Sequence, residues 1–335
     1  MNGNSMALSV RDLAIGFASA TGRRLEPVLG VDLEVARGEV VALVGESGSG
    51  KSLTALACLG LLPAGATARG SVRVDDTEIN GAAPAALERL RGRRIAMIFQ
   101  NPMSALNPFF TIAEQIDAVI AAHFPSTAAA RRERRARALD QVQLAHGLAQ
   151  RYPHQLSGGQ LQRAMIAMAM CCEPAVLVAD EPTTALDVTV QARVMAVLLK
   201  LVDAGTGLLL ITHDLALVAQ TSQRVHVMYA GRIVESGSTV DVFKQPAHPY
   251  TAGLLATQPR MGVPPARLPV IPGQVPALAE RLGGCMFRAR CSRAEADCAL
   301  RAPLPLARPV HRTLACHHPV PAQTGLTALQ EQNHA

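Results

Sequence analysis

Residues 45–52 of this chain read Gly45-Glu46-Ser47-Gly48-Ser49-Gly50-Lys51-Ser52 (GESGSGKS). The stretch fits the pattern G-x-x-x-x-G-K-S/T and follows an apolar run, VVALV, that predicts a buried strand leading into a helix. Glycines allow backbone N–H groups to turn inward around phosphate oxygens, Lys51 can reach the β- and γ-phosphates, and Ser52 can ligate Mg²⁺. The alternative is a glycine-rich turn that binds nothing. The strand–turn–helix context favours a nucleotide-phosphate site.

A second stretch, AVLVADEP at 175–182, is an apolar strand that ends in two carboxylates. Asp180, at the end of the strand, is suited to the Mg²⁺ shell, and the neighbouring Glu181 is suited to polarise an attacking water. In isolation, two acidic residues here are also compatible with a cap for the next helix. Their combination with residues 45–52 favours nucleotide hydrolysis.

The order of predicted elements indicates the fold class. Short alternating segments near the N-terminus predict a small β layer, and residues 101–155 have a helical pattern. Strands alternating with helices favour a parallel α/β sheet with a helical insertion. The predicted strands are 40–44, 95–99, 175–180 and 207–212, and the predicted helices are 159–171, 190–202 and one from Asp214.

Composition excludes several classes of protein. The chain has 335 residues, 49% hydrophobic and 17% charged, which is enough for about two globular domains. No apolar run reaches the roughly 18–20 residues that span a bilayer, and the start, MNGNSMALSVRD, does not resemble a secretion signal. Net charge is +6, but the basic run at 131–137 is typical of a solvated helix face, and aromatic residues are only 3%. We therefore expect a cytosolic protein with reduced thiols.

The stretch LSGGQ at 156–160 narrows the interpretation to a family. Ser157, Gly158 and Gly159 stand at a predicted helix start, where backbone donors face an anion. With the two stretches above, this resembles the ATP-binding-cassette (ABC) ATPases. The resemblance implies an α/β fold with a RecA-like core, an antiparallel β layer and a helical subdomain. It also implies that two such chains face each other and bind ATP between them.

The resemblance assigns roles to further positions. Gln100 matches a residue that contacts Mg²⁺ and links the site to the membrane subunits, although alone it would be taken as a surface residue. His213 matches the contact to the γ-phosphate, and 185–187 match a loop at the dimer interface. Phe17 matches the aromatic residue that stacks on adenine, with a core aromatic as an equal alternative. The implied site has Glu181, His213 and Gln100 in catalysis; Ser52, Gln100 and Asp180 on Mg²⁺; and, on ATP, Phe17, Gly45, Glu46, Ser47, Gly48, Ser49, Gly50, Lys51, Ser52 and, in trans, Ser157, Gly158, Gly159 and Gln160.

Longer stretches resemble one group within the superfamily. AMIFQNPMSALNPF, YPHQLSGGQLQR and HPYTAGLL are similar to the ATP-binding subunits of dipeptide and oligopeptide importers, a group that includes nickel and glutathione importers. The resemblance implies two transmembrane permease subunits, a second, different ABC ATPase as dimer partner, and an extracytoplasmic solute-binding protein. It places the chain at the cytoplasmic face of the inner membrane. Peptides are the expected solute, with nickel complexes or glutathione as alternatives.

A nucleic-acid ATPase with the same cassette is the rival interpretation from another class. The stretch between Lys51 and Ser157 is too short for the large insertions of those proteins, and no C-x-x-C pair is present. No specific nucleic-acid partner is therefore expected. The predicted domains are 1–245 for the ATPase, with a helical subdomain at about 101–165, and 246–320 for an extension that begins with a proline-rich extended connection. Residues 321–335 are predicted to form a loose tail.

Four cysteines, Cys285, Cys291, Cys298 and Cys316, gather in the extension, separated by five, six and seventeen residues. Disulfides are unfavourable in a reducing cytosol. Structural zinc commonly uses C-x₂₋₄-C pairs, although His317 or His318 would be able to complete a zinc set. Irregularly spaced thiolates can hold a 4Fe–4S cluster, which the resemblance to the dipeptide-permease group implies. Unliganded buried thiols are the remaining alternative.

Overall fold

The central feature of the protein is an eight-stranded sheet with strand order β11-β12-β10-β9-β3-β8-β7-β6. The computed structural model describes residues 5–18, 24–184, 186–258, 270–281, 283–309 and 312–321. Strands β3, β7 and β8 are buried along their whole length, as expected for parallel strands covered on both faces. The strands are β3 (Val40–Val44), β6 (Ile95–Ile98), β7 (Val176–Asp180), β8 (Gly207–Ile211), β9 (Arg224–Tyr229), β10 (Arg232–Ser238), β11 (Leu306–Arg308) and β12 (Arg312–Leu314).

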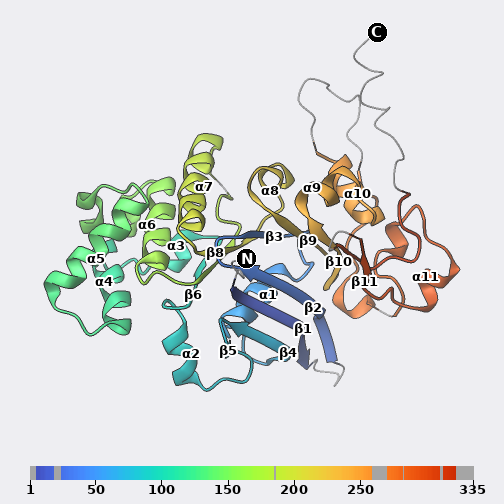
Figure 1. Cartoon of the computed structure of the whole chain (residues 1–335), viewed down its shortest axis with the longest axis horizontal. Coiled ribbons are helices and arrows are strands. Elements are labelled where there is room, and N and C mark those ends of the chain that lie inside the picture. Colours follow the sequence, from blue (N-terminus) through green and yellow to red (C-terminus); the bar gives the residue numbers. More distant parts are fainter. Residues whose placement is uncertain are drawn as a thin grey trace, which may run out of the picture.

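The predicted small β layer is a four-stranded antiparallel sheet, β2-β1-β4-β5, seen as the blue strands below the central sheet in Figure 1. Its apolar side chains share one core with helix α1 and with β3, β7 and β8. Because α1 is held in this core, the loop before it has a fixed position. The elements are β1 (Met6–Ala18), β2 (Arg24–Ala36), α1 (Lys51–Cys58), β4 (Ala66–Val74) and β5 (Thr77–Glu78).

A helical lobe follows β6 and builds a second core against the other face of the sheet. Thr111 forms a capping box with Glu114 at the start of α4, and Thr127 and Asp187 cap α5 and α7. The predicted helical insertion and the predicted fold class are confirmed. The helices after β6 are α3 (Pro102–Ala105), α4 (Ile112–His123), α5 (Ala128–Gln141), α6 (Gly158–Met170) and α7 (Val188–Asp203), with 3₁₀ turns η1 (His146–Gln150) and η2 (Pro153–Gln155). Helix α2 (Pro84–Leu90) precedes β6 and packs against the first core.

The region after residue 245 is more ordered than the sequence indicates. The predicted extended connection is wrong at α10 (Pro249–Ala256), where His248 Nδ1 accepts a hydrogen bond from the Tyr250 N–H at 3.0 Å and Pro249 opens the first turn. Within α10 only Tyr250 and Thr251 are buried, so the helix carries no apolar period to detect. The other helical elements of this region are η3 (Leu278–Glu280), η4 (Arg288–Arg290) and α11 (Ala296–Leu300), and α8 (Leu215–Thr221) and α9 (Thr239–Lys244) precede it.

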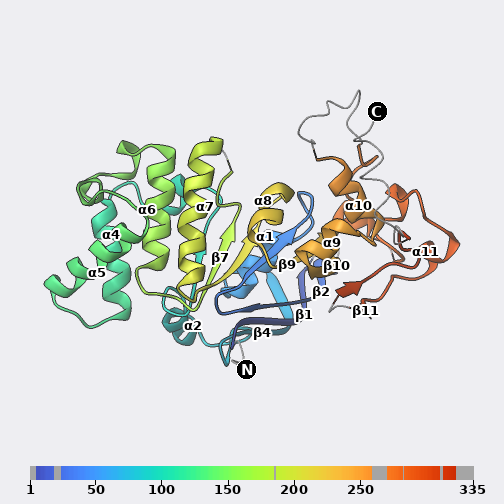
Figure 2. The same cartoon turned by 45° about the horizontal axis from the view of Figure 1, so that its top comes forward.

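The extension packs against the β10 edge of the sheet. Strand β12 pairs antiparallel with β10, which brings Leu314 opposite Glu235. The rings of Tyr229, Tyr250 and Phe287 meet with centroids 4.7–5.4 Å apart. Figures 1 and 2 place the extension and the helical lobe at opposite ends of the molecule. The boundary at 245 stays a prediction, and the predicted tail lies almost wholly outside the described residues.

Candidate nucleotide site

The loop between β3 and α1 has a backbone that requires glycine. Gly45, Gly48 and Gly50 have φ values of 153°, 76° and 108°. A Cβ on Gly45 would lie 2.1 Å from the Met228 carbonyl oxygen, so no other residue fits there. Lys51 opens α1 and is 7% exposed, and its Nζ donates to the carbonyls of Gly45 at 2.7 Å and Glu46 at 2.9 Å. Burial lowers the Lys51 pKa, against the opposing effect of nearby carboxylates.

Two carboxylates stand where β7 ends, as predicted. Asp180 is buried, which raises its pKa, and the Ser52 hydroxyl partly offsets this rise. Two of the three predicted Mg²⁺ ligands, Ser52 and Asp180, are therefore neighbours, and their oxygens are of the kind that Mg²⁺ prefers. Glu181 has a φ of 48°, which is strained for a residue with a side chain.

Three polar side chains surround the Glu181 carboxylate. Gln100 Nε2 donates to Oε2 at 3.0 Å, Thr184 Oγ1 donates to the same oxygen at 2.8 Å, and His213 Nδ1 lies 3.1 Å from Oε1. Burial raises the Glu181 pKa, but the bonds from Thr184 and His213 outweigh it and leave the pKa below its ordinary value. Glu181 is thus held ionised at neutral pH. Sequence reasoning missed Thr184, which stands three residues after Glu181 in the DEPTT stretch.

The carboxyl ends of three adjacent parallel strands bring these groups together. Gln100 follows β6, Glu181 follows β7 and His213 follows β8. They line one cavity of about 660 Å³ together with the glycine-rich loop, a volume in the range of small-molecule sites. Of the predicted site residues, the cavity lining includes Gly45, Ser47, Gly48, Gly50, Lys51, Ser52, Gln100, Glu181 and His213.

Other predicted positions lie outside the cavity lining. Phe17 is partly buried and packs into the core between the two sheets. The Glu46 N–H donates to the Tyr250 hydroxyl at 2.9 Å, and Ser49 is fully buried beneath the loop. Ser157 caps α6, and Ser157 and Gly158 are exposed and do not line this cavity. Their contact with ATP in trans stays a prediction. Ala185 lies outside the described residues.

Comparisons with known proteins decide the family. Residues 28–184 match the family model described as "ABC transporter", and residues 234–298 match "Oligopeptide/dipeptide transporter, C-terminal region". The chain is 47% identical over 299 residues to the "Probable D,D-dipeptide transport ATP-binding protein DdpD" of Escherichia coli (strain K12), which covers 87% of this chain and 90% of that protein. The chain belongs to the ABC transporter ATPases. Its resemblance to that family is confirmed.

Two further comparisons agree. This ABC ATPase is 43% identical over 316 residues to the "Oligopeptide transport ATP-binding protein OppD" of Escherichia coli (strain K12), covering 93% of each chain. It superposes on the dimeric bacterial ABC transporter cassette MJ0796 with a TM-score of 0.63 at 27% identity, covering 69% of this chain and 98% of that one. The protein is therefore an ATPase that uses ATP with Mg²⁺. The roles of individual residues remain predictions.

The four cysteines of the ABC ATPase's extension converge although the chain between them is irregular. The Cys285 N–H donates to the Cys298 carbonyl at 2.7 Å. Burial raises the Cys316 pKa to about 11, and the other three thiols are close enough to add to the rise. All four are free thiols.

Among the described residues, no three of these four sulfurs lie within 4.8 Å of one another. Zn–S bonds of about 2.3 Å place tetrahedral sulfurs about 3.8 Å apart. Among the described residues, the only group of three potential ligands within 4.8 Å of one another is Asp297, Cys298 and His318. His318 Nε2 already lies 2.7 Å from an Asp297 oxygen.

Proposed function

We propose that this ABC ATPase is the motor of an importer that takes up di- or oligopeptides through partner permease subunits. The observation that carries the proposal is that Gln100 and His213 both contact Glu181 beside the glycine-rich loop, an arrangement suited to hydrolysis once a second subunit supplies the in-trans residues. The printed names of the relatives DdpD and OppD, both transport ATP-binding proteins, support peptides as the solute. Nickel complexes and glutathione are the alternatives within the same group.

In the proposed reaction the loop amides and Lys51 bind the phosphates, while Ser52, Gln100 and Asp180 hold Mg²⁺. When bound, Mg²⁺ neutralises charge on the β- and γ-phosphates. Glu181 is ionised and accepts a proton from the attacking water. The His213 ring lies beside the Glu181 carboxylate. In the proposed reaction His213 contacts the γ-phosphate, so both side chains act at the γ-phosphate end of the nucleotide.

The proposed partners are two permease subunits, a second ABC ATPase that forms a heterodimer with this chain, and a solute-binding protein. After Gln100 the chain exposes apolar side chains, including Met103, Phe110 and the 84% exposed Phe109. Such a patch is suited to a protein contact, and we assign it to the permeases. None of the helices among the described residues is long and apolar enough to cross a bilayer. We place the chain peripherally, on the cytoplasmic face of the inner membrane.

Reconstitution with the permease and binding-protein partners tests the function. Labelled dipeptide should enter vesicles only when ATP is present on the ATPase side, because the motor energy comes from differential ATP binding to two dimer states. Unlabelled tripeptide, glutathione and a nickel chelate should be compared as competitors. Uptake of nickel or glutathione but no peptide would replace the proposed solute, and uptake without ATP would contradict the motor.

We also propose that Cys285, Cys291, Cys298 and Cys316 hold a 4Fe–4S cluster. The four thiols lie close enough to influence one another, and they are partly or fully buried. The segment around them has few apolar side chains, so a bound metal centre would offset the entropy of ordering it. The role assigned to the cluster is structural.

Protein purified without oxygen should be brown, absorb broadly near about 400 nm and contain about four irons per chain. Changing Cys291 and Cys298 to Ser should remove the colour and the iron, because serine replaces the thiolate ligands. Cys172→Ser, in the core beneath α6, is the matched control and should keep both. Colourless protein from an anaerobic, iron-replete preparation would contradict the cluster.

A further inference from the structure

One wall of the nucleotide cavity comes from the C-terminal extension. Val275, Pro276, Ala277, Leu278 and Arg281 line the cavity opposite the glycine-rich loop. We infer that Arg281 is a further nucleotide-binding residue, whose guanidinium binds the phosphates of ATP and ADP. The inference rests on the proposed nucleotide site and adds to it a phosphate contact from the C-terminal extension.

The position of Arg281 places its charge beside the loop. Its Nη2 donates to the Gly48 carbonyl at 3.2 Å, and its Nη1 donates to the Pro27 carbonyl at 3.4 Å. Its Nε donates to the Pro276 carbonyl at 3.4 Å. These long bonds to neutral oxygens fix the side chain across the mouth of the cavity.

Arg281 has no anionic partner within the part of the chain that the structure describes. No carboxylate there lies within 4.0 Å of its guanidinium. The side chain is only partly exposed, and burial lowers its pKa. A cation held partly out of water without a counter-charge is costly, and an anion that enters the cavity relieves this cost.

Phosphate is the anion that fits best. The guanidinium presents planar, paired N–H donors that match two phosphate oxygens, and such charge-assisted bonds are stronger than neutral ones. A nucleotide bound by Lys51 and the loop amides already brings its phosphates to the neighbourhood of Gly48. The extension then adds a second cationic side chain to a site that otherwise relies on Lys51, Mg²⁺ and the α1 N-terminus.

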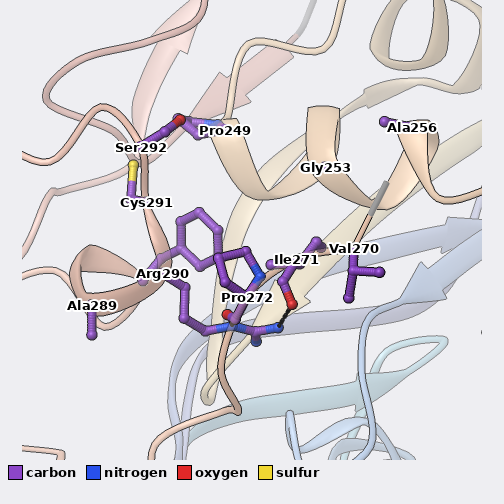
Figure 3. Close-up of a pocket in the computed structure, with 11 residues that line it drawn as sticks. Pro249, Gly253, Ala256, Val270, Ile271, Pro272, Ala289, Arg290, Cys291 and Ser292 are labelled. Atoms are coloured by element: carbon purple, nitrogen blue, oxygen red, sulfur yellow. Dashed lines mark hydrogen bonds between the residues drawn. The ribbon is translucent and has the colours of Figure 1, made fainter. Parts of the chain in front are cut away.

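A second arginine holds this wall in place. Arg290 donates two hydrogen bonds to the Glu46 carboxylate, at 2.8 and 3.1 Å, and its side chain is 6% exposed. The same guanidinium bonds the carbonyls of Ile271 and Pro272, and Figure 3 shows it beside both residues. Because residues 271 and 272 lead directly into 275–278, the wall is tied to the loop before any nucleotide binds.

Calorimetric titration of the full chain tests Arg281 with ADP and adenosine as probes. Arg281→Gln should weaken ADP binding about tenfold, the usual scale for losing one charge-assisted hydrogen bond. Adenosine binding should be unchanged, because it has no phosphate. Arg281→Lys keeps the charge and should lose less affinity. Arg308→Gln, an exposed charge removed from the same extension, is the matched control and should bind both probes normally.

Unchanged ADP affinity in Arg281→Gln would overturn the inference, as would an equal loss of ADP and adenosine affinity. Lys51→Ala, titrated in parallel, distinguishes failure of the Arg281 contact from failure of the proposed nucleotide site. If Lys51→Ala loses ADP binding and Arg281→Gln does not, only the Arg281 contact is wrong. If Lys51→Ala also binds ADP normally, the nucleotide site itself is wrong, and the Arg281 contact with it.

Discussion

Glu181→Gln should abolish steady-state ATP hydrolysis and leave ATP binding intact. The carboxylate lies beside the loop but makes no contact that holds phosphate, so its loss removes proton acceptance only. Loss of a general base lowers a rate by about 10²–10⁴-fold. The glutamine should retain the hydrogen bond with Thr184, which keeps the strained backbone at this position supported.

Hydrolysis by the assembled transporter and ATP binding by the isolated chain are the two measurements. Size-exclusion chromatography of this chain mixed with its partner ATPase and ATP should show an increased dimer population for Glu181→Gln, because the ATP-bound closed state no longer turns over. Glu133→Gln on the exposed face of α5 is the matched control and should behave as wild type. Turnover of Glu181→Gln at the wild-type rate would refute the role assigned to Glu181.

Arg290→Leu should destabilise the protein by about 3 kcal/mol, the lower end of the range for breaking a buried ion pair. The Arg290 side chain is almost fully enclosed, whereas Glu46 is 28% exposed and water can partly compensate its charge. The change also removes the bonds to Ile271 and Pro272, so the wall of the nucleotide cavity loosens. ADP affinity should therefore fall together with the melting temperature.

A double-mutant cycle separates the pair from general damage. Glu46→Gln with Arg290→Leu removes both charges and should recover part of the stability that Arg290→Leu loses, because no unpaired carboxylate remains. Arg288→Leu, two residues away, bonds only carbonyls of the extension and is the matched control. Additive losses in the double variant would show that Arg290 and Glu46 are not coupled.

Motifs confined to a few neighbouring residues were predictable, and contacts between distant segments were not. Gly45, Gly48 and Gly50 allow the backbone conformation of residues 45–52, so the sequence of these eight residues is enough to predict the loop. The bond between Arg290 and Glu46 joins residues 244 apart, and no local period signals it. Arg281 also stands in a segment without hydrophobic periodicity, so its contact with the glycine-rich loop has no signal in the neighbouring sequence. Both contacts depend on how the extension folds back.

The same distinction explains what the sequence does not reveal at single positions. Helix α10 was missed because its start is defined by the His248 side chain and Pro249, while burial along it is confined to Tyr250 and Thr251. The contact of Glu46 with ATP stays a prediction; what the loop motif does not reveal is that the Glu46 N–H bonds Tyr250 and the Glu46 carboxylate bonds Arg290. A motif predicts the backbone path, whereas the direction of each side chain depends on tertiary neighbours.

The pairing of β12 with β10 has a consequence for truncated versions of this protein. Glu235 on β10 is 0% exposed and accepts hydrogen bonds from the Ala247 and His248 N–H groups and from Arg312. A chain cut after residue 245 would leave this carboxylate without partners and would turn β10 into a bare sheet edge. Bare edges recruit strands from other molecules, so the shortened cassette should aggregate where the whole chain stays dispersed.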